Sequence, residues 1–229
     1  MKATVVQARE RKATLEEGRL FGNMLSSMPL CFNLIGPLYD KSEFAALLAE
    51  VLDLPIASIV EATCEWAPPK ETGLGDLTAF DAFVRFTSKD GSPGFLGIET
   101  KYTEPFSPRE YDVETYRPFT EASDWFRPGA SDALGGKATN QLWRNVLLAA
   151  TLSARGTHGG GWSVVLYLSD DESLLRAKEA LAPYLSRPEK VRWCSYEYLV
   201  AVARHHEGLQ DWARWFQRRY LDLSPIGLS

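Results

Sequence analysis

The spacing of apolar residues changes along the first hundred positions, and each change predicts a new kind of element. Over residues 12–28 and again over 43–52, apolar residues recur every three or four positions, which is the period of one face of a helix. On the second stretch these residues are Phe44, Leu47, Leu48 and Val51. We therefore expect two helices, and we expect Ser42 to cap the second.

The segment between these helices, residues 26–40, is apolar but contains Pro29, Gly36 and Pro37. Proline removes a backbone donor and glycine weakens regular structure, so both residue types interrupt helices and strands. We expect an irregular connection here.

Beyond residue 56 the apolar runs are short, rich in β-branched and aromatic residues, and separated by turn residues. One run covers residues 57–66, and two further runs, 77–87 and 94–103, flank an Asp-Gly pair at positions 90 and 91. This arrangement predicts one strand followed by a β-hairpin.

The second half begins with an aperiodic segment, residues 107–136, which we expect to form a mobile flap or an irregular insertion over a cleft. The elements expected after it are helix 139–154, strand 162–169, helix 170–185, a strand or strand-to-helix junction at 191–199, and a helical tail over 200–223. The tail carries an aromatic stripe that we interpret as core packing, formed by Trp212, Trp215, Phe216 and Tyr220.

This order of elements predicts an α/β fold in which helices flank a central mixed β-sheet. The 229 residues, 45% of them hydrophobic, are enough for one large domain. We expect a single domain over residues 1–229, with an N-terminal helical lead-in (1–40) and a C-terminal helical extension (197–229).

Composition narrows the classes of function. The net charge of −5 and the isoelectric point of about 5.4 argue against a general nucleic-acid binder, although they leave room for a local positive groove. No apolar run approaches the ~18 residues of a membrane span, and the N-terminus lacks the apolar core of a secretory signal. The three cysteines share no metal-ligand spacing, which favours a reduced cytoplasmic protein, and the three histidines form no zinc pattern.

The hairpin carries charges inside its strands, namely Asp81 in the first arm and Glu99 and Lys101 in the second. An unpaired buried charge is costly, so such groups are normally excluded, paired or bound to a metal. A turn near residues 90 and 91 places Asp81 opposite Glu99 or Lys101, whereas a register between these two places it on the other face. The alternative interpretation is a solvent-exposed face with an ordinary Asp–Lys pair.

These residue types suit a metal site. Two carboxylates on adjacent strands can hold Mg²⁺ or Mn²⁺, and the backbone carbonyl of Thr100, between Glu99 and Lys101, is placed to add a third oxygen. A bound cation of this kind lowers the pKa of a water molecule and neutralises phosphate charge. Lys101 is then suited to position or deprotonate the attacking water, or to stabilise the developing charge.

The segments "FDAF" and "GIETKY" together resemble the bipartite signature of the PD-(D/E)XK nuclease superfamily, in which an acid is followed, after a variable gap, by Glu or Asp, any residue and Lys. Phe80 stands where the signature has proline. The resemblance implies a restriction-endonuclease-like core over roughly residues 42–170. It also implies that Asp81 and Glu99 are metal ligands and that Lys101 is the catalytic lysine. The segments "LSSMPLCFNLIGPL" and "GIETKYTE" resemble bacterial proteins usually placed in this superfamily, a resemblance that names no substrate.

Four further residues are candidates for the site. Glu65, at the end of the preceding strand, is considered as another metal carboxylate, against the alternative of a solvated strand-end acid. Lys137, Gln141 and Arg144 form one stripe of the helix that follows the hairpin, and we consider them as substrate-binding residues. The alternative for this stripe is an ordinary solvated helix face.

The leading hypothesis is a divalent-metal-dependent nuclease that hydrolyses phosphodiester bonds, with DNA favoured over RNA as its partner. The main alternative is a catalytically inactive nuclease-fold protein that acts as a binding or assembly module, which the acidic composition favours. A glycosidase is a weaker third interpretation, because Lys101 has no necessary role in it. A homodimer is also considered.

Overall fold

The computed structural model describes residues 2–11, 13, 15–23, 25–104 and 112–222. Its strands are β1 (Ile56–Trp66), β2 (Phe80–Ser88), β3 (Pro93–Thr100), β4 (Gly160–Tyr167) and β5 (Val191–Ser195). Its α-helices are α1 (Lys2–Glu10), α2 (Glu17–Gly22), α3 (Ser27–Tyr39), α4 (Phe44–Leu52), α5 (Val113–Ala122), α6 (Ala130–Leu134), α7 (Asn140–Arg155), α8 (Glu172–Leu181), α9 (Tyr196–Ala203) and α10 (Gln210–Phe216). Short 3₁₀ turns are η1 (Ala182–Tyr184), η2 (Pro188–Lys190) and η3 (Glu207–Leu209), and η4 (Gln217–Leu221) is a π-helical turn.

The five strands form one mixed sheet in the order β1-β2-β3-β4-β5. The pairs β1–β2 and β2–β3 are antiparallel, and the pairs β3–β4 and β4–β5 are parallel. The tight turn at Asp90 and Gly91 makes β2 and β3 antiparallel neighbours, whereas the parallel pair β3–β4 is joined through helices. The expected α/β class with a mixed sheet is confirmed.

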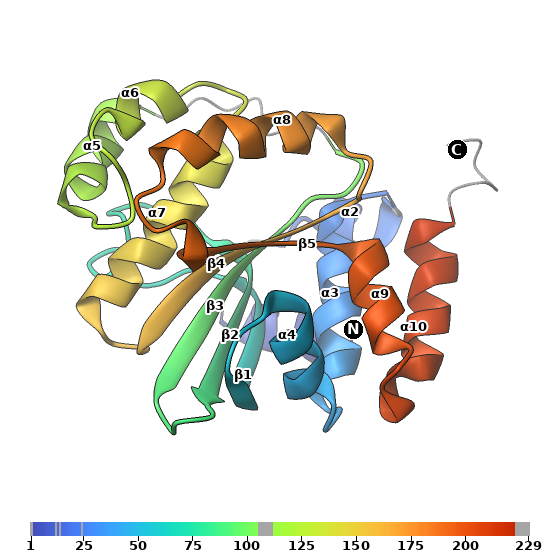
Figure 1. The fold of residues 1–229 in the computed structure, drawn as a ribbon. Helices are drawn as coiled ribbons and strands as arrows, with labels where there is room; N and C mark the ends of the chain where they lie inside the picture. The colour runs from blue at the N-terminus through green and yellow to red at the C-terminus, as the bar shows by residue number, and fades with distance from the viewer. Residues whose placement is uncertain (1, 12, 14, 24, 105–111, 223–229) are drawn as a thin grey trace.

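Helices cover both faces of this sheet (Figure 1). One face packs against α3, α4, α9 and α10 through a large apolar cluster that includes Phe32, Leu47, Val84 and Phe216. The other face packs against α7, with α5, α6 and α8 beyond it, through clusters that include Phe83, Phe95, Trp143 and Leu174. The site described below lies on the α7 face.

The expectation of an irregular segment at 26–40 is wrong, because residues 27–39 form helix α3. Ser26 caps this helix by accepting a hydrogen bond from Met28 N. Pro29 lies in the first turn, where backbone amides have no partner within the helix. Pro37 leaves the carbonyl of Asn33 without its usual amide partner, and the indole Nε1 of Trp212 donates to that oxygen at 3.3 Å. The tertiary contact thus compensates for the proline.

Other boundaries also differ from the expectations. The helix expected over 12–28 is reduced to α2, residues 17–22, since Asn23 is extended and its Oδ1 accepts a hydrogen bond from Leu25 N. Helix α4 starts at Phe44 with Glu43 as its N-cap residue, and Ser42 Oγ donates to the Glu43 carboxylate instead of capping the backbone.

The segment expected to be a flap or an irregular insertion contains two helices, α5 and α6, while its residues 107–111 lie outside the described part of the chain. Arg117 on α5 donates to Ser131 and Asp132 of α6, which ties the two helices together. Within the described residues no helix has the length and apolar character needed to cross a membrane.

In the tail, the aromatic stripe is core at three of its four positions, since Trp212, Phe216 and Tyr220 are buried and Trp215 is 37% exposed.

Candidate active site

The register of the hairpin brings its two acidic residues together. Ala82 pairs with Ile98 and Phe83 with Gly97, so the next position along the ladder places Asp81 opposite Glu99. Side chains alternate across a strand, and both residues therefore point to the same face as Phe83. This is the face that packs against α7.

Asp81 is anchored to the neighbouring strand. Its Oδ2 accepts hydrogen bonds from Thr100 N and Thr100 Oγ1, each at 2.7 Å. On the other side of the sheet the Cys31 thiol of α3 donates to the Asp81 carbonyl at 3.3 Å. Burial, followed by the charge of Glu99, raises the pKa of Asp81 to about 7. Asp81 is thus fixed in position but electrostatically unfavourable as an anion.

Glu99 is only 3% exposed and has three polar partners. Gln141 Nε2 donates to Glu99 Oε1 at 2.6 Å, and Asn145 Nδ2 donates to Glu99 Oε2 at 2.5 Å. Lys101 Nζ lies 3.0 Å from Glu99 Oε1 as an ion pair. Gln141 and Asn145 are one turn apart on α7, so that helix orients both oxygens of the carboxylate.

Lys101 follows the last residue of β3, and its backbone amide donates to Leu166 O of β4 at 2.7 Å. Its ammonium group donates to Gln141 Oε1 at 2.6 Å in addition to the ion pair with Glu99. The Gln141 amide therefore bridges the acid and the lysine, as donor to one and acceptor from the other. Asn145 is not among the residues predicted from the sequence, although it lies four residues after Gln141, on the same helix face.

Glu65, the residue before the last of β1, has a left-handed backbone conformation with φ of 51°. Burial, followed by the negative charges of Asp81 and Glu99, raises its pKa to about 9. The charges of Asp81 and Glu99 thus act on Glu65, and Asp81 lies opposite Glu99 in the strand register. A divalent cation requires oxygen donors and negative charge, and both are concentrated here. Among the described residues, no group of three or more His, Cys, Asp or Glu side chains is arranged to hold a metal ion. Asp81 and Glu99 are the two carboxylates that the register of β2 and β3 places opposite each other.

The two remaining candidates on this stripe, Lys137 and Arg144, lie in different surroundings. Lys137 is exposed in the turn before α7. Arg144 is 7% exposed and belongs to a second cluster, in which it donates to Thr78 Oγ1 at 2.5 Å, lies 3.6 Å from Asp76 Oδ2 and covers the Tyr116 ring. Arg144 therefore joins α7 to α5 and to the loop before β2.

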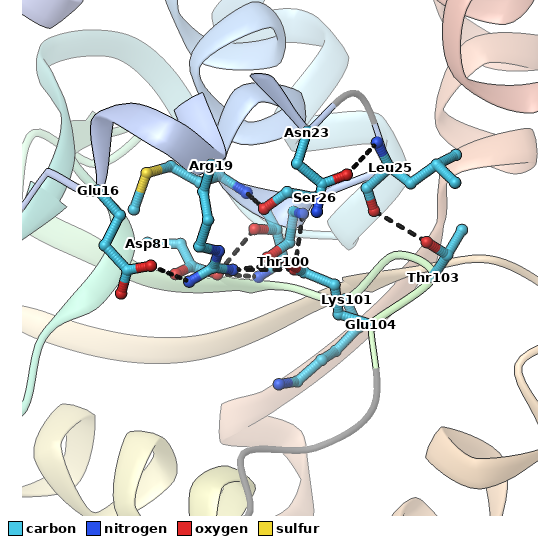
Figure 2. A network of polar contacts seen from close by, with 12 residues as sticks. Glu16, Arg19, Asn23, Leu25, Ser26, Asp81, Thr100, Lys101, Thr103 and Glu104 are labelled. Carbon is cyan, nitrogen blue, oxygen red and sulfur yellow. Dashed lines mark hydrogen bonds and ion pairs between the residues drawn. The ribbon is translucent and has the colours of Figure 1, made fainter. Parts of the chain in front are cut away.

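The N-terminal segment contributes a contact that the sequence analysis did not predict. Arg19 on α2 and Ser27 at the start of α3 both bind the carboxylate of Glu104, three residues beyond Lys101 (Figure 2). Thr103 Oγ1 donates to Leu25 O at 2.8 Å in the same region. The chain leaving β3 is thus fastened to the connection between α2 and α3.

Comparison with known families gives one match. The model of the PD-(D/E)XK nuclease superfamily matches residues 1–222, which is almost the whole chain. Neither the comparison with curated proteins nor that with solved structures returned a significant match. The five-stranded mixed sheet flanked by helices agrees with the restriction-endonuclease-like α/β fold expected for this superfamily. The chain belongs to the PD-(D/E)XK nuclease superfamily.

Proposed function

We propose that the protein is a divalent-metal-dependent nuclease that hydrolyses phosphodiester bonds of DNA. The observation that carries the proposal is the buried arrangement of Glu99 and Lys101, bridged by Gln141, beside Asp81 on the paired strand. Membership of a superfamily whose members are usually nucleases supports the same conclusion.

Asp81 and Glu99 would hold Mg²⁺ or Mn²⁺, with the Thr100 carbonyl and Glu65 as the further oxygen donors considered. When bound, such a cation supplies Lewis-acid chemistry, which lowers the pKa of water and neutralises phosphate charge. Asn145 and Gln141 hold the Glu99 carboxylate in place, so that its orientation does not depend on the substrate.

We assign Lys101 a role in stabilising the transition state. Its ammonium group donates to Glu99 and Gln141, and a charged donor in a site with little water stabilises negative charge that develops on a phosphate oxygen. The same group is placed to orient an attacking water molecule.

Two observations favour the alternative, a nuclease-fold protein without activity that serves as a binding or assembly module. The net charge is −5, and the Glu99 carboxylate already has protein donors at both oxygens. A fully paired carboxylate is stable without a cation.

Cleavage assays decide between these functions. Labelled double-stranded DNA, single-stranded DNA and RNA are incubated with the protein and Mg²⁺, Mn²⁺ or EDTA. We expect DNA cleavage with either cation, none with EDTA, and none by Asp81→Asn or Lys101→Ala. Glu61→Gln is the matched control, because Glu61 lies on β1 in an exposed pair with Arg85. Binding without cleavage under all these conditions would support the module instead.

Two further features belong to this proposal. The three cysteines are buried and free, which suits a reducing compartment such as the cytoplasm. Light scattering on the same preparations tests whether the protein forms the homodimer considered above.

A further inference from the structure

The Glu104 carboxylate occupies a pocket of hydrogen-bond donors contributed by the N-terminal segment. Arg19 Nη2 donates to Glu104 Oε1 at 3.0 Å and to Oε2 at 2.9 Å. Ser27 N and Ser27 Oγ each donate to Oε2 at 2.9 Å. The bonds from Ser27, together with the charge of Arg19, help to lower the pKa of Glu104 although its partial burial opposes this. The pocket therefore stabilises an anion.

This pocket borders the carboxylate site. Glu104 follows Lys101 by three residues, so their Cα atoms are at most about 11 Å apart. Burial raises the pKa of Glu65 to about 9, and the positive charge of Arg19 acts on this carboxyl group in the opposite direction. Figure 2 shows the Arg19 side chain between Glu16 and Glu104.

The donors in the pocket match those that proteins use for phosphate. A guanidinium group offers a planar fork to two oxygens, and a backbone amide in the first turn of a helix adds a donor near the positive end of the helix dipole. Ser27 supplies both this amide and a hydroxyl group. A carboxylate presents two oxygens to such a set, as a phosphodiester group does.

A polyanionic substrate gains from such a group at this place, because Glu99 and the ionised form of Asp81 repel it. The Lys101 side chain is only 10% exposed and is paired with Glu99, whereas the Arg19 side chain is 37% exposed and that of Glu104 is 27% exposed. Incoming phosphate can therefore reach Arg19 from solvent.

We propose that Arg19 and Ser27 form a subsite for a backbone phosphate of the nucleic acid next to the cleaved bond, and that Glu104 occupies this subsite when no substrate is bound. The inference rests on the proposed nuclease function and adds a substrate-binding role for the N-terminal segment. Glu104 then acts as an internal competitor of the substrate.

If Glu104 competes with the substrate, substitutions of Arg19 and of Glu104 should change substrate affinity in opposite directions. Removing Arg19 removes the phosphate donor, whereas removing the Glu104 charge releases the donor for substrate. A purely structural clamp between α2 and the chain after β3 would instead make the two variants behave alike.

The test measures dissociation constants for a short labelled DNA duplex by fluorescence anisotropy in Ca²⁺, with KM and kcat in Mg²⁺. Arg19→Ala is expected to raise Kd and KM by about 10-fold with kcat changed by less than about 2-fold, and Arg19→Lys to fall between it and the wild type. Glu104→Gln is expected to bind as tightly as the wild type or more tightly. Arg9→Ala is the control, because Arg9 of α1 forms an exposed ion pair with Glu17 of α2, the helix that carries Arg19.

An equal loss of affinity in Arg19→Ala and Glu104→Gln, or unchanged affinity in Arg19→Ala, would overturn the subsite. A wild type that binds DNA without cleaving it would overturn the proposed function and leave the anisotropy comparison decisive. If the wild type binds no DNA, inorganic phosphate is the probe. It should raise the melting temperature of Glu104→Gln more than that of Arg19→Ala, and equal shifts would reject the subsite.

Discussion

The ammonium group of Lys101 lies 3.0 Å from Glu99 Oε1, and both side chains are shielded from solvent. Lys101 comes directly after β3 and two residues after Glu99, so the two side chains share a face, and Gln141 of α7 contacts both. Such a pair is retained only if its remaining hydrogen-bonding capacity is satisfied, because each buried charge loses its hydration. Gln141 and Asn145 of α7 supply hydrogen bonds to this pair.

The bridge by Gln141 leads to the first prediction. Gln141→Leu removes a donor to Glu99 and an acceptor for Lys101 at once, so the free energy of unfolding should fall by about 1–3 kcal/mol. Urea denaturation measures this change. Gln7→Leu, at an exposed position of α1, should change it by less than about 0.5 kcal/mol. Equal stabilities of the two variants would show that the bridge contributes nothing.

Metal binding should stabilise the folded protein. Under the proposed function Mg²⁺ or Mn²⁺ would bind the assembled carboxylates and not the unfolded chain, so either ion should raise the melting temperature of the wild type. Glu99→Gln should lose most of that rise, whereas Glu61→Gln should keep it. Thermal unfolding with and without the ion is the measurement, and an equal rise in Glu99→Gln and the wild type would place the ion elsewhere.

The stability of the protein, without and with a bound metal ion, should depend on pH. The pKa of Asp81 is raised from an ordinary 3.8 to about 7, and that of Glu65 from 4.5 to about 9. The unfolded chain therefore loses these protons first, so metal-free stability should fall between about pH 4 and pH 9 and level off above that range.

Mg²⁺ requires the ionised carboxylates, so its stabilising effect should be larger at pH 8.5 than at pH 5.5. Melting temperatures at the two pH values test this, and Asp81→Asn should flatten the difference. A metal-induced rise that is the same at both pH values in the wild type would contradict the expectation.

Arg144 and Lys137, both considered as substrate-binding residues, should behave differently. Arg144→Met breaks the contacts with Thr78, Asp76 and Tyr116 and should lower the free energy of unfolding by about 1–3 kcal/mol. Lys137→Ala should leave stability nearly unchanged but weaken DNA binding and reduce its salt dependence. Urea denaturation and binding titrations at several salt concentrations measure both effects. A stable Arg144→Met variant with weakened binding would return Arg144 to a substrate role.

Gly97 should be needed for close packing beside the site. A methyl group at this position would lie 2.4 Å from two ring carbons of Phe80, which is fully buried. Gly97→Ala should therefore lower the free energy of unfolding by about 1–3 kcal/mol. The control is Gly160→Ala on β4, where the added methyl would have its nearest neighbours at 3.8 Å. Similar denaturation midpoints for the two variants would refute the packing requirement.

The sequence contained enough information to identify the hairpin and its charged residues. Turn residues at Asp90 and Gly91 fix the reversal, and strict alternation places Glu99 and Lys101 on one face. The sequence did not determine on which face of the sheet Asp81 lies, because a shift of one residue in the hairpin register moves it to the other face. The Ala82–Ile98 pairing fixes that register.

The local sequence pattern gave a wrong prediction where a residue distant in the sequence supplies a hydrogen-bond partner that the segment itself lacks. Residues 26–40 contain two prolines and a glycine, yet helix α3 forms, because Trp212 donates to the Asn33 carbonyl that Pro37 leaves without an amide. Nothing near position 37 in the sequence signals this contact. Propensity describes a segment on its own, and tertiary packing can override it.

The sequence by itself therefore determined the α/β class, the strand pair and the types of residue available for chemistry, because periodicity and turn chemistry act over a few positions. Tertiary structure alone decided which partners surround them. The orientation of α7 about its axis directs Gln141 and Asn145 toward Glu99, and it places Arg144 in a separate buried cluster. The path of the N-terminal segment brings Arg19 into contact with Glu104, which lies 85 residues away in the sequence. These contacts depend on how complete elements pack, and packing is a property of the whole core.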